Sequence, residues 1–183
     1  NVDIHTSHEV LCINHSTKIV TVKNLLTGDV FEDKYDVLVF ATGATFLTPD
    51  AFLGKHFENV FQVRNINSGK KIKSFIENEK PMTAVIVGAG YIGLEVAEQL
   101  KARGIEVTIL QRGKHPLSHL DWDMSIRIED EMIKQGIDFR SEETIQTLNG
   151  SSRLDEAITN KGTKLSADMY ILATGVQPNV SLA

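Results

Sequence analysis

Three glycines with the spacing G-x-G-x-x-G, Gly88, Gly90 and Gly93, are the residues that point most clearly to a chemistry. They follow an apolar run at 84–87 and open a stretch of helical periodicity that ends near Gly104. Parallel strands buried on both faces have such apolar runs, and amphipathic helices repeat every three to four residues. The pattern therefore predicts a strand, a tight turn and a helix whose N-terminus can bind a phosphate.

Each glycine has its own mechanical part in such a turn. Gly88 permits the tight turn, Gly90 lets the backbone approach a pyrophosphate, and Gly93 lets the helix pack closely on the strand. A second apolar strand is predicted at 107–110, at the distance that a dinucleotide-binding βαβ unit requires. We therefore predict a nucleotide site; the alternative is a glycine-rich loop that only turns the chain.

Composition and charge exclude several classes of partner. The 183-residue chain has a net charge of -5 and no concentrated Lys/Arg stripe, which argues against nucleic acid, because such binding neutralises phosphates. No apolar run approaches the roughly 18 residues of a membrane span, and no signal-peptide pattern is found. Cys12 is the only cysteine, so an internal disulfide is excluded and a cytoplasmic setting is expected. Its strand-like neighbours predict that Cys12 packs in the core.

Comparison of the chain with itself reveals a duplicated unit. The two copies begin near residues 2 and 137, and both close on an apolar run that ends in Ala-Thr-Gly, at 41–43 and 173–175. Each copy is predicted to contain a strand, a small antiparallel meander and a return strand, and in the first copy the two flanking strands are expected at 2–7 and 36–43. The first copy has no glycine turn before it. By the symmetry of the repeat, we expect a longer protein with a further glycine turn and a second nucleotide upstream.

Two more helices complete the predicted arrangement. Residues 68–78 have the spacing of a short amphipathic helix with a solvated, lysine-rich face. Residues 123–135 are predicted to form a second crossover helix, in which Met124 and Met132 fill the core. A third parallel strand is expected at 137–139.

The elements together predict an α/β fold. We expect a Rossmann-like NAD(P)-binding domain with a three-stranded antiparallel meander, flanked by a partial copy of a second nucleotide-binding domain. The expected boundaries are 1–48 for the partial copy, 49–81 for a linker and lead-in helix, and 82–183 for the Rossmann-like domain.

Three motifs, in this order, resemble those of the pyridine nucleotide-disulfide oxidoreductases, which are flavoproteins with tandem FAD and NAD(P) domains. Residues 35–43 resemble the return of the chain to the FAD domain, 87–95 the NAD(P) motif, and 173–179 the end of the NAD(P) domain. The stretch 120–125 is most similar to the branch of coenzyme A-disulfide reductases, NADH oxidases and NADH peroxidases. The resemblance implies that 1–48 is the C-terminal part of an FAD-domain-like unit.

The resemblance implies an enzyme that passes hydride from NADH or NADPH to FAD and then electrons to a disulfide-type, oxygen or peroxide acceptor, most closely coenzyme A disulfide. Nothing in the chain matches the family's redox cysteine, so no catalytic residue is assigned and Cys12 receives no such role. The full-length protein is expected to be a homodimer that binds small-molecule cofactors. Two alternatives stay open: a flavin-free NAD(P)-dependent dehydrogenase and a non-catalytic nucleotide-sensing Rossmann module.

The residues expected at the cofactors come from the turn, its helix, the end of the second strand and the two Ala-Thr-Gly runs. Tyr91 resembles the family's gate over the flavin, and Glu95 is expected near the nicotinamide; the alternatives are a packed tyrosine and a helix-surface carboxylate. The residues expected to bind NAD(P) are Gly88, Ala89, Gly90, Tyr91, Ile92, Gly93, Glu95, Gln111, Arg112, Ala173, Thr174 and Gly175, and those expected to contact FAD are Val10, Ala41, Thr42 and Gly43.

The end of the second strand bears on the choice between NADPH and NADH. NAD sites usually place Asp or Glu there to hold the ribose 2′-hydroxyl, and this chain has Gln111 followed by Arg112. Because a guanidinium pairs with phosphate, the sequence favours NADPH, with use of both nucleotides and a merely solvated Arg112 as alternatives. His115 and His119 have the i, i+4 spacing of metal ligands, but Pro116 lies between them and no Glu or Cys completes a pattern. We therefore expect no metal, and a loop beside the adenosine instead.

Overall fold

The computed structural model describes residues 2–183, which form two compact units. Unit 1 comprises the residues up to Thr45 together with 177–183, and unit 2 comprises 46–176. Strands β4 (Ala44–Phe46) and β13 (Val176–Pro178) pair with each other, and the chain passes from one unit to the other within them. The domain boundaries drawn from the sequence, at 48 and 81, remain predictions.

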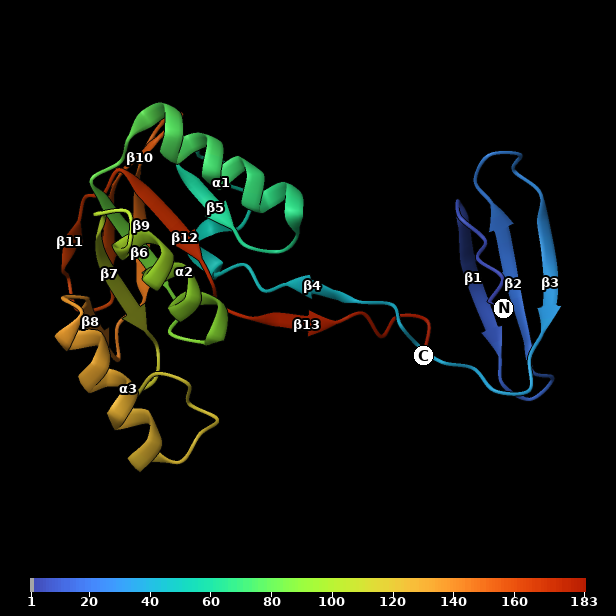
Figure 1. Cartoon of the computed structure of the whole chain (residues 1–183). Coiled ribbons are helices and arrows are strands. Elements are labelled where there is room, and N and C mark those ends of the chain that lie inside the picture. The colour runs from blue at the N-terminus through green and yellow to red at the C-terminus, as the bar shows by residue number, and fades with distance from the viewer. Residues whose placement is uncertain (1) are drawn as a thin grey trace. The chain divides into compact units, whose positions relative to one another are not determined.

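Unit 2 is built on a five-stranded parallel sheet in the order β5-β12-β6-β7-β8 (Figure 1). The chain order reverses at β6, since β7 and β8 lie on one side of it and β12 on the other. Ligands of open α/β sheets bind outside the carboxyl ends of the strands at such a reversal. The strand bounds are β5 (Val60–Gln62), β6 (Thr83–Val87), β7 (Glu106–Gln111), β8 (Asp138–Ser141) and β12 (Met169–Leu172).

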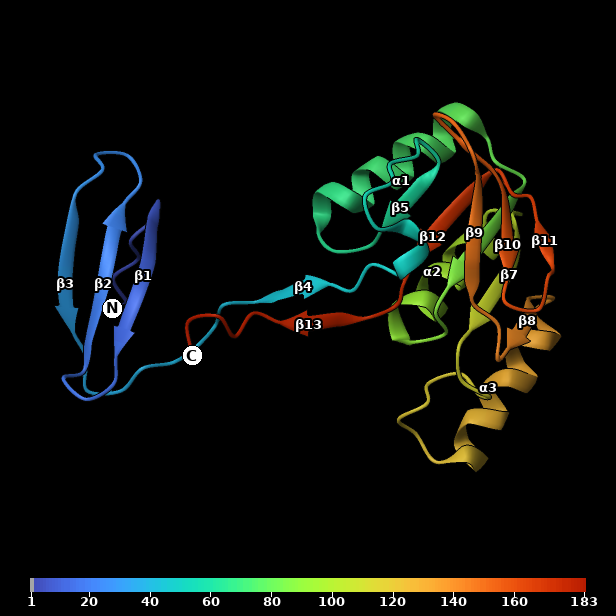
Figure 2. The ribbon, with the colours of Figure 1, turned by 180° about the vertical axis from the view of Figure 1, so that it is seen from behind.

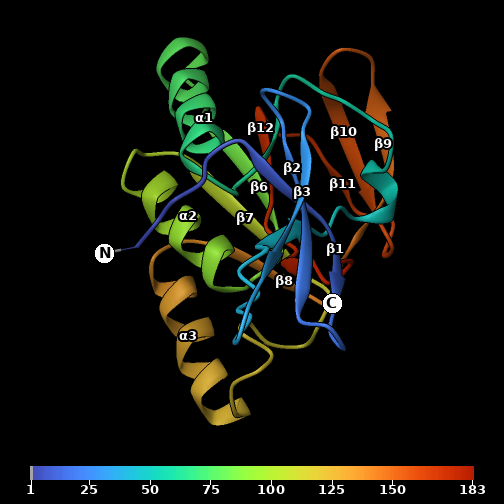
Figure 3. The ribbon, with the colours of Figure 1, turned by 90° about the vertical axis from the view of Figure 1, so that its right-hand side faces the viewer.

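Helices cover one face of this sheet, as Figure 3 shows: α1 (Ile66–Glu79), α2 (Tyr91–Lys101) and α3 (Trp122–Lys134). Alternate residues of the strands point to them, among them Ile86 and Ile109, which are fully buried against side chains of the helices. The three predicted helices, the strands β6, β7 and β12 and the Rossmann-like arrangement are thus confirmed, although α2 and β12 each end three residues before their expected ends at Gly104 and Gly175. Among residues 2–183, no helix is long and apolar enough to span a membrane.

An antiparallel meander covers the other face of the sheet (Figure 2). It consists of β9 (Ile145–Gly150), β10 (Leu154–Thr159) and β11 (Lys164–Leu165), with the short helix η1 (Asp50–Phe52) beside β9. The remaining alternate residues of the strands, including Val85 and Tyr170, form a second apolar core with this meander. The predicted three-stranded meander of the second copy is therefore confirmed.

Unit 1 repeats the meander but not the rest of the copy. Its three antiparallel strands are β1 (His8–Asn14), β2 (Ile19–Asn24) and β3 (Val30–Lys34). The strands predicted at 2–7 and 36–43 are wrong, because both segments are irregular, and Val37 is 82% exposed. Backbone groups of a strand need a partner strand, and unit 1 offers no parallel sheet within the described residues.

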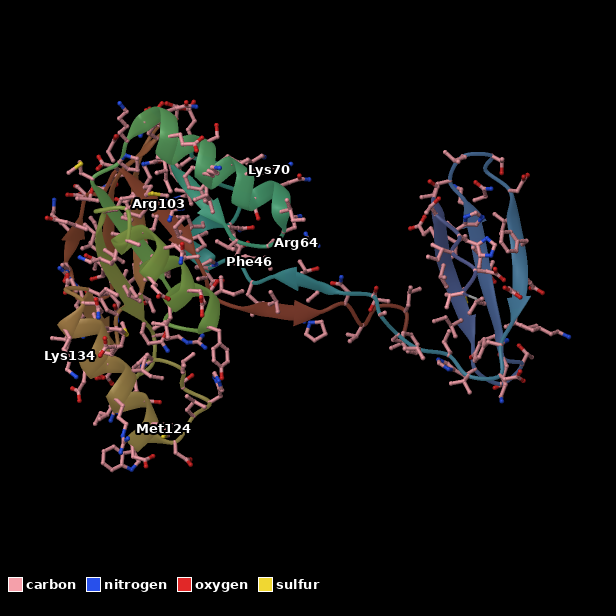
Figure 4. The ribbon with its side chains drawn as sticks, viewed as in Figure 1. Phe46, Arg64, Lys70, Arg103, Met124 and Lys134 are labelled. Atoms are coloured by element: carbon pink, nitrogen blue, oxygen red, sulfur yellow. The ribbon has the colours of Figure 1, made fainter. Side chains whose placement is uncertain are left out.

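Two predicted core residues are exposed instead. Cys12 lies in β1 just after a β-bulge at Val10, which shifts the alternation of faces, and its thiol is exposed. Met124, in the first turn of α3, is 52% exposed, whereas Met132 is buried as expected. The lysine-rich face of α1 is solvated, as predicted; Figure 4 shows Lys70 projecting from this helix.

Asn59 joins three elements of unit 2 from a buried position. Its side-chain Nδ2 donates to the carbonyl of Leu154 (3.0 Å) and to that of Asp168 (3.2 Å), and its Oδ1 accepts the Leu154 N–H (2.8 Å). Its backbone carbonyl accepts the N–H of Tyr170 at 2.8 Å. Asn59 therefore fixes β10 and β12 to the segment that leads into β5.

We expect Asn59→Ala to destabilise the protein by about 2–4 kcal/mol, because it leaves buried backbone groups of Leu154 and Asp168 without partners. Urea unfolding followed by circular dichroism measures the change. Asn78→Ala is the matched control, since Asn78 is exposed and its Nδ2 makes a side-chain hydrogen bond to Ser74 on the surface of α1. Equal stabilities of the Asn59→Ala and Asn78→Ala variants would contradict the assigned role.

Candidate nucleotide-binding site

The turn after β6 is shaped by a close backbone contact at Gly88. Gly88 has φ of +109°, its N–H donates to Leu110 O (2.8 Å), and a Cβ added to it would lie 2.4 Å from Ala173 O. Such a φ is costly for other residues, and such a contact is closer than any side chain permits. The turn can therefore approach the end of β12 only with glycine at this position.

The other two glycines of the motif differ sharply from each other. A Cβ at Gly93 would lie 2.0 Å from Gly88 O, so a glycine here lets α2 pack directly on the turn. Gly90 has extended backbone (φ −84°, ψ −178°), and a Cβ there would meet nothing within 4 Å. The fold therefore requires Gly88 and Gly93, whereas Gly90 keeps a space in front of the turn free.

The N-terminus of α2 opens onto this space. Gly90 is the N-cap, and the first intrahelical bond runs from the Leu94 N–H to its carbonyl (3.0 Å). The N–H groups of Tyr91, Ile92 and Gly93 precede any intrahelical acceptor and point out of the helix end. Together with the positive end of the helix dipole, they form a site for a phosphate group.

The second Ala-Thr-Gly run lies beside the turn, at the reversal of strand order. The Ala173 N–H donates to Val87 O (2.8 Å), which continues the pairing of β12 with β6 to their carboxyl ends. The Thr174 hydroxyl donates to Leu47 O, and Gly175 O accepts the Leu47 N–H at 3.1 Å. The structure thus brings the residues expected at 88–93 and at 173–174 together.

Gln111 is already hydrogen-bonded within unit 2. Its Oε1 accepts the Ala89 N–H (3.1 Å), and its Nε2 donates to His115 O (3.3 Å). Gln111 therefore ties the glycine turn to the loop after β7. Arg112 is exposed and, among residues 2–183, makes no ion pair.

Tyr91 is the first residue of α2, directly after the glycine turn, and 61% of its surface is exposed. Its ring packs on that of His119, with 4.9 Å between centroids. His115 instead has Nδ1 3.4 Å from Glu129 Oε2, so the two histidines have different partners. The contact of His119 with Tyr91 was not foreseen, because His119 lies in an irregular loop where spacing carries no information.

Glu95 lies one turn further along α2 and is exposed. It lines a groove of about 390 Å³ between α1 and α2, with Lys73 and Arg103 also in the lining. The position fits either expectation, a group that orients a bound ligand or a helix-surface carboxylate.

Two carboxyl groups of unit 2 have lowered pKa values. Burial raises the pKa of Glu143, but hydrogen bonds, among them one from the Thr159 hydroxyl (2.6 Å), and nearby cations outweigh it and hold the pKa below its ordinary value. Burial likewise raises the pKa of Asp168, and the N–H groups of Met82 and Thr83 outweigh it. Both carboxylates stay ionised at neutral pH and are hydrogen-bonded within unit 2, so they stabilise the fold rather than transfer protons.

The residues expected at FAD lie in unit 1. Ala41, Thr42 and Gly43 form an exposed, irregular segment, and Gly43 has φ of +70° with open space around it. Val10 lies in β1, where it is half-buried and paired with Val22. The segment at 41–43 can therefore offer backbone groups to a ligand, while Val10 can offer only apolar contact and edge backbone.

Residues 1–183 match the sequence model of one protein family, the pyridine nucleotide-disulphide oxidoreductases. The chain belongs to this family, as its three motifs predict. A coenzyme A disulfide reductase of Staphylococcus epidermidis is 37% identical over 178 residues, which cover 97% of this chain and 39% of the relative. An NADH oxidase of Methanocaldococcus jannaschii is 37% identical over 185 positions, which cover 100% of this chain and 40% of the relative.

Solved structures agree with these relatives. The structure of reduced Bacillus anthracis CoADR-RHD has a TM-score of 0.78 and 31% identity, and the match covers 96% of this chain and 31% of that one. The chain thus spans about two fifths of the length of the curated relatives it matches. Membership of the family implies FAD with NADH or NADPH as cofactors.

We expect Gly90→Val to weaken nucleotide binding by roughly a hundredfold or more, because the side chain fills the space in front of the α2 N-terminus and blocks charge-assisted hydrogen bonds. The backbone of Gly90 suits any residue, so the melting temperature is expected to stay near that of wild type. Isothermal calorimetry with NADPH and NADH measures the affinity.

Gly69→Val is the matched control, since Gly69 lies in α1 and also has open space around it. An affinity of the Gly90→Val protein equal to that of the control would mean that the turn is only structural.

Proposed function

We propose that this chain is the nicotinamide-nucleotide-binding segment of an FAD-dependent oxidoreductase that takes hydride from NADH or NADPH and passes electrons to a further acceptor. The observation that carries the proposal is the open space at Gly90, directly in front of unpaired N–H groups of α2. A turn that served only to reverse the chain would have no need of glycine there. The bound cofactors supply the hydride chemistry, and the protein binds and orients them.

We propose a binding position in unit 2 for each part of the nucleotide. The N–H groups at the start of α2 hold the pyrophosphate, and the loop after β7 receives the adenosine half. Ala173, Thr174 and Gly175 offer backbone groups to the nicotinamide half, beside the turn. Tyr91, exposed at the mouth of the turn, covers the nicotinamide position and moves aside when the nucleotide binds.

The flavin is assigned to residues of unit 1, with backbone contacts from Ala41, Thr42 and Gly43 and apolar contact from Val10. The segment 1–48 then belongs to an FAD domain, 49–81 links the domains, and 82–183 binds the nicotinamide nucleotide. Relatives of the chain support coenzyme A disulfide as the acceptor, with oxygen or peroxide as the next choices. The full-length enzyme is proposed to be a cytoplasmic homodimer, a setting that fits the single free cysteine.

The separate segment 1–183 is expected to bind NAD(P)H without oxidising it, whereas the full-length protein reduces its flavin on mixing with NAD(P)H. The physical reason is that the separate segment lacks the flavin that would accept the hydride and has no residue that matches the redox cysteine. Stopped-flow absorbance at the flavin and nicotinamide bands measures both reactions. Catalytic oxidation by a flavin-free segment would support a dehydrogenase instead, and full-length protein that binds nucleotide without flavin reduction would support a nucleotide sensor.

We propose NADPH as the preferred nucleotide. Gln111 keeps a carboxylate away from the ribose, and a carboxylate about 4 Å from a 2′-phosphate would repel each of its charges by roughly 1–4 kcal/mol. The amide of Gln111 is held by Ala89 and His115, so the neighbouring Arg112 is the group available to a 2′-phosphate.

Arg112→Ala is expected to weaken NADPH binding about five- to thirtyfold and to leave NADH binding unchanged, because a charge-assisted pair to the 2′-phosphate is lost. Dissociation constants of both nucleotides, measured by tryptophan or NAD(P)H fluorescence, test this. Arg127→Ala is the control, since Arg127 is exposed on α3. A tighter constant for NADH in wild type, or NADPH affinity untouched by Arg112→Ala, contradicts the preference.

A further inference from the structure

The two Ala-Thr-Gly runs make the same pair of hydrogen bonds, each within its own unit. In unit 1, the Thr42 hydroxyl donates to Asn179 O (2.6 Å), and the Asn179 N–H donates to Gly43 O (3.0 Å). In unit 2, the Thr174 hydroxyl donates to Leu47 O, and the Leu47 N–H donates to Gly175 O. Asn179 and Leu47 hold equivalent positions in the two copies, because Asn179 lies five residues after Thr174 and Leu47 lies five residues after Thr42. Each of them binds the Ala-Thr-Gly run of the other copy.

The side chains at these two equivalent positions break the symmetry. Asn179 Nδ2 donates to Thr42 O (2.9 Å), and its Oδ1 accepts the Thr45 hydroxyl (2.6 Å). Every polar atom of Asn179 therefore has a partner within residues 42–45. Leu47 binds the Ala-Thr-Gly run at 173–175 through backbone atoms alone, because its side chain has no polar group.

The two side-chain hydrogen bonds of Asn179 reach Thr42 and Thr45, at the end of an irregular segment. Residues 36–43 form no strand, and Ala41, Thr42 and Gly43 are exposed. Asn179 is hydrogen-bonded to both Thr42 and Gly43, and these contacts fix the orientation of their backbone groups. Neutral groups make all four bonds, so this attachment does not depend on the ionisation of its members.

We propose that Asn179 is a positioning residue for the flavin: it holds the backbone of residues 42–45 so that Ala41, Thr42 and Gly43 present fixed backbone groups to FAD. The inference rests on the proposed function, in which this segment contacts FAD. Asn179 acts through Thr42 and Gly43 and does not touch the cofactor itself. Because the Thr42 hydroxyl already donates a hydrogen bond to Asn179 O, Thr42 offers FAD its backbone rather than its side chain.

The experiment uses full-length holoenzyme with Asn179→Leu, which copies the residue of the other repeat. We expect the dissociation constant of FAD to rise about tenfold to a hundredfold, since two side-chain hydrogen bonds are lost. The fluorescence and visible circular dichroism of the bound flavin are expected to change, while KM for NAD(P)H stays constant. Hydrogen exchange of the amides at 43–45 is expected to accelerate.

Two further variants separate positioning from general stability. Asn24→Leu is the matched control, because Asn24 also lies in unit 1 and accepts two backbone N–H groups with its side chain, at 2.9 and 3.3 Å. It is expected to leave FAD affinity and flavin spectra unchanged. Thr45→Val removes only the bond to Asn179 Oδ1, and it is expected to raise the FAD constant about three- to tenfold. Thr45→Val decides the question if Asn179→Leu does not fold.

Wild-type FAD affinity and flavin spectra in folded Asn179→Leu would overturn the proposal, and so would an equal loss of FAD in Asn24→Leu. Failure of the proposed function has a different signature, namely wild-type full-length protein that binds no FAD. In that case unchanged amide exchange at 43–45 in Asn179→Leu still overturns the positioning role.

Discussion

The close approach of the Gly88 turn to the end of β12 is the constraint on which unit 2 depends. A side chain on Gly88 would collide with the Ala173 carbonyl, and one on Gly93 would collide with Gly88 itself. These two glycines therefore let β12 insert beside β6 and let α2 begin directly above the sheet. The start of α2 lies beside the point where the strand order reverses, and the space in front of it, at Gly90, stays open.

The proposed nucleotide site is built from backbone groups, and such a site would let a chain of net charge -5 bind an anion. The N–H groups and the helix end supply local positive potential whatever the overall charge. The ionised side chains with shifted pKa values serve elsewhere: Asp168 holds the starts of β6 and β12 together, and Glu143 is bonded to Thr159 in the meander. Chemistry and stability are thus assigned to different residues.

The duplication shows how one sequence pattern reaches two outcomes. Both copies form a three-stranded meander, because hairpin turns and neighbouring strands suffice for local antiparallel pairing. Only the second copy forms its return strand, since β12 finds β5 and β6 on either side. The corresponding run at 36–43 has the same apolar pattern and is irregular in the structure of residues 2–183. Asn179 forms hydrogen bonds with Thr42 and Gly43 at the end of this run.

The sequence by itself determined the glycine turn, the three helices and the strands β6, β7 and β12, because strand and helix periodicity and the glycine spacing are local properties. It also determined the family, since three motifs in a fixed order are more specific than any one of them. Only the tertiary structure showed that Cys12, after a β-bulge, and Met124, in the first turn of α3, are exposed. It also decided that Gln111 bonds to the turn, that His119 packs on Tyr91 and that Asn179 holds the first Ala-Thr-Gly. These contacts join residues whose proximity depends on the path of the whole chain, and no local pattern encodes that path.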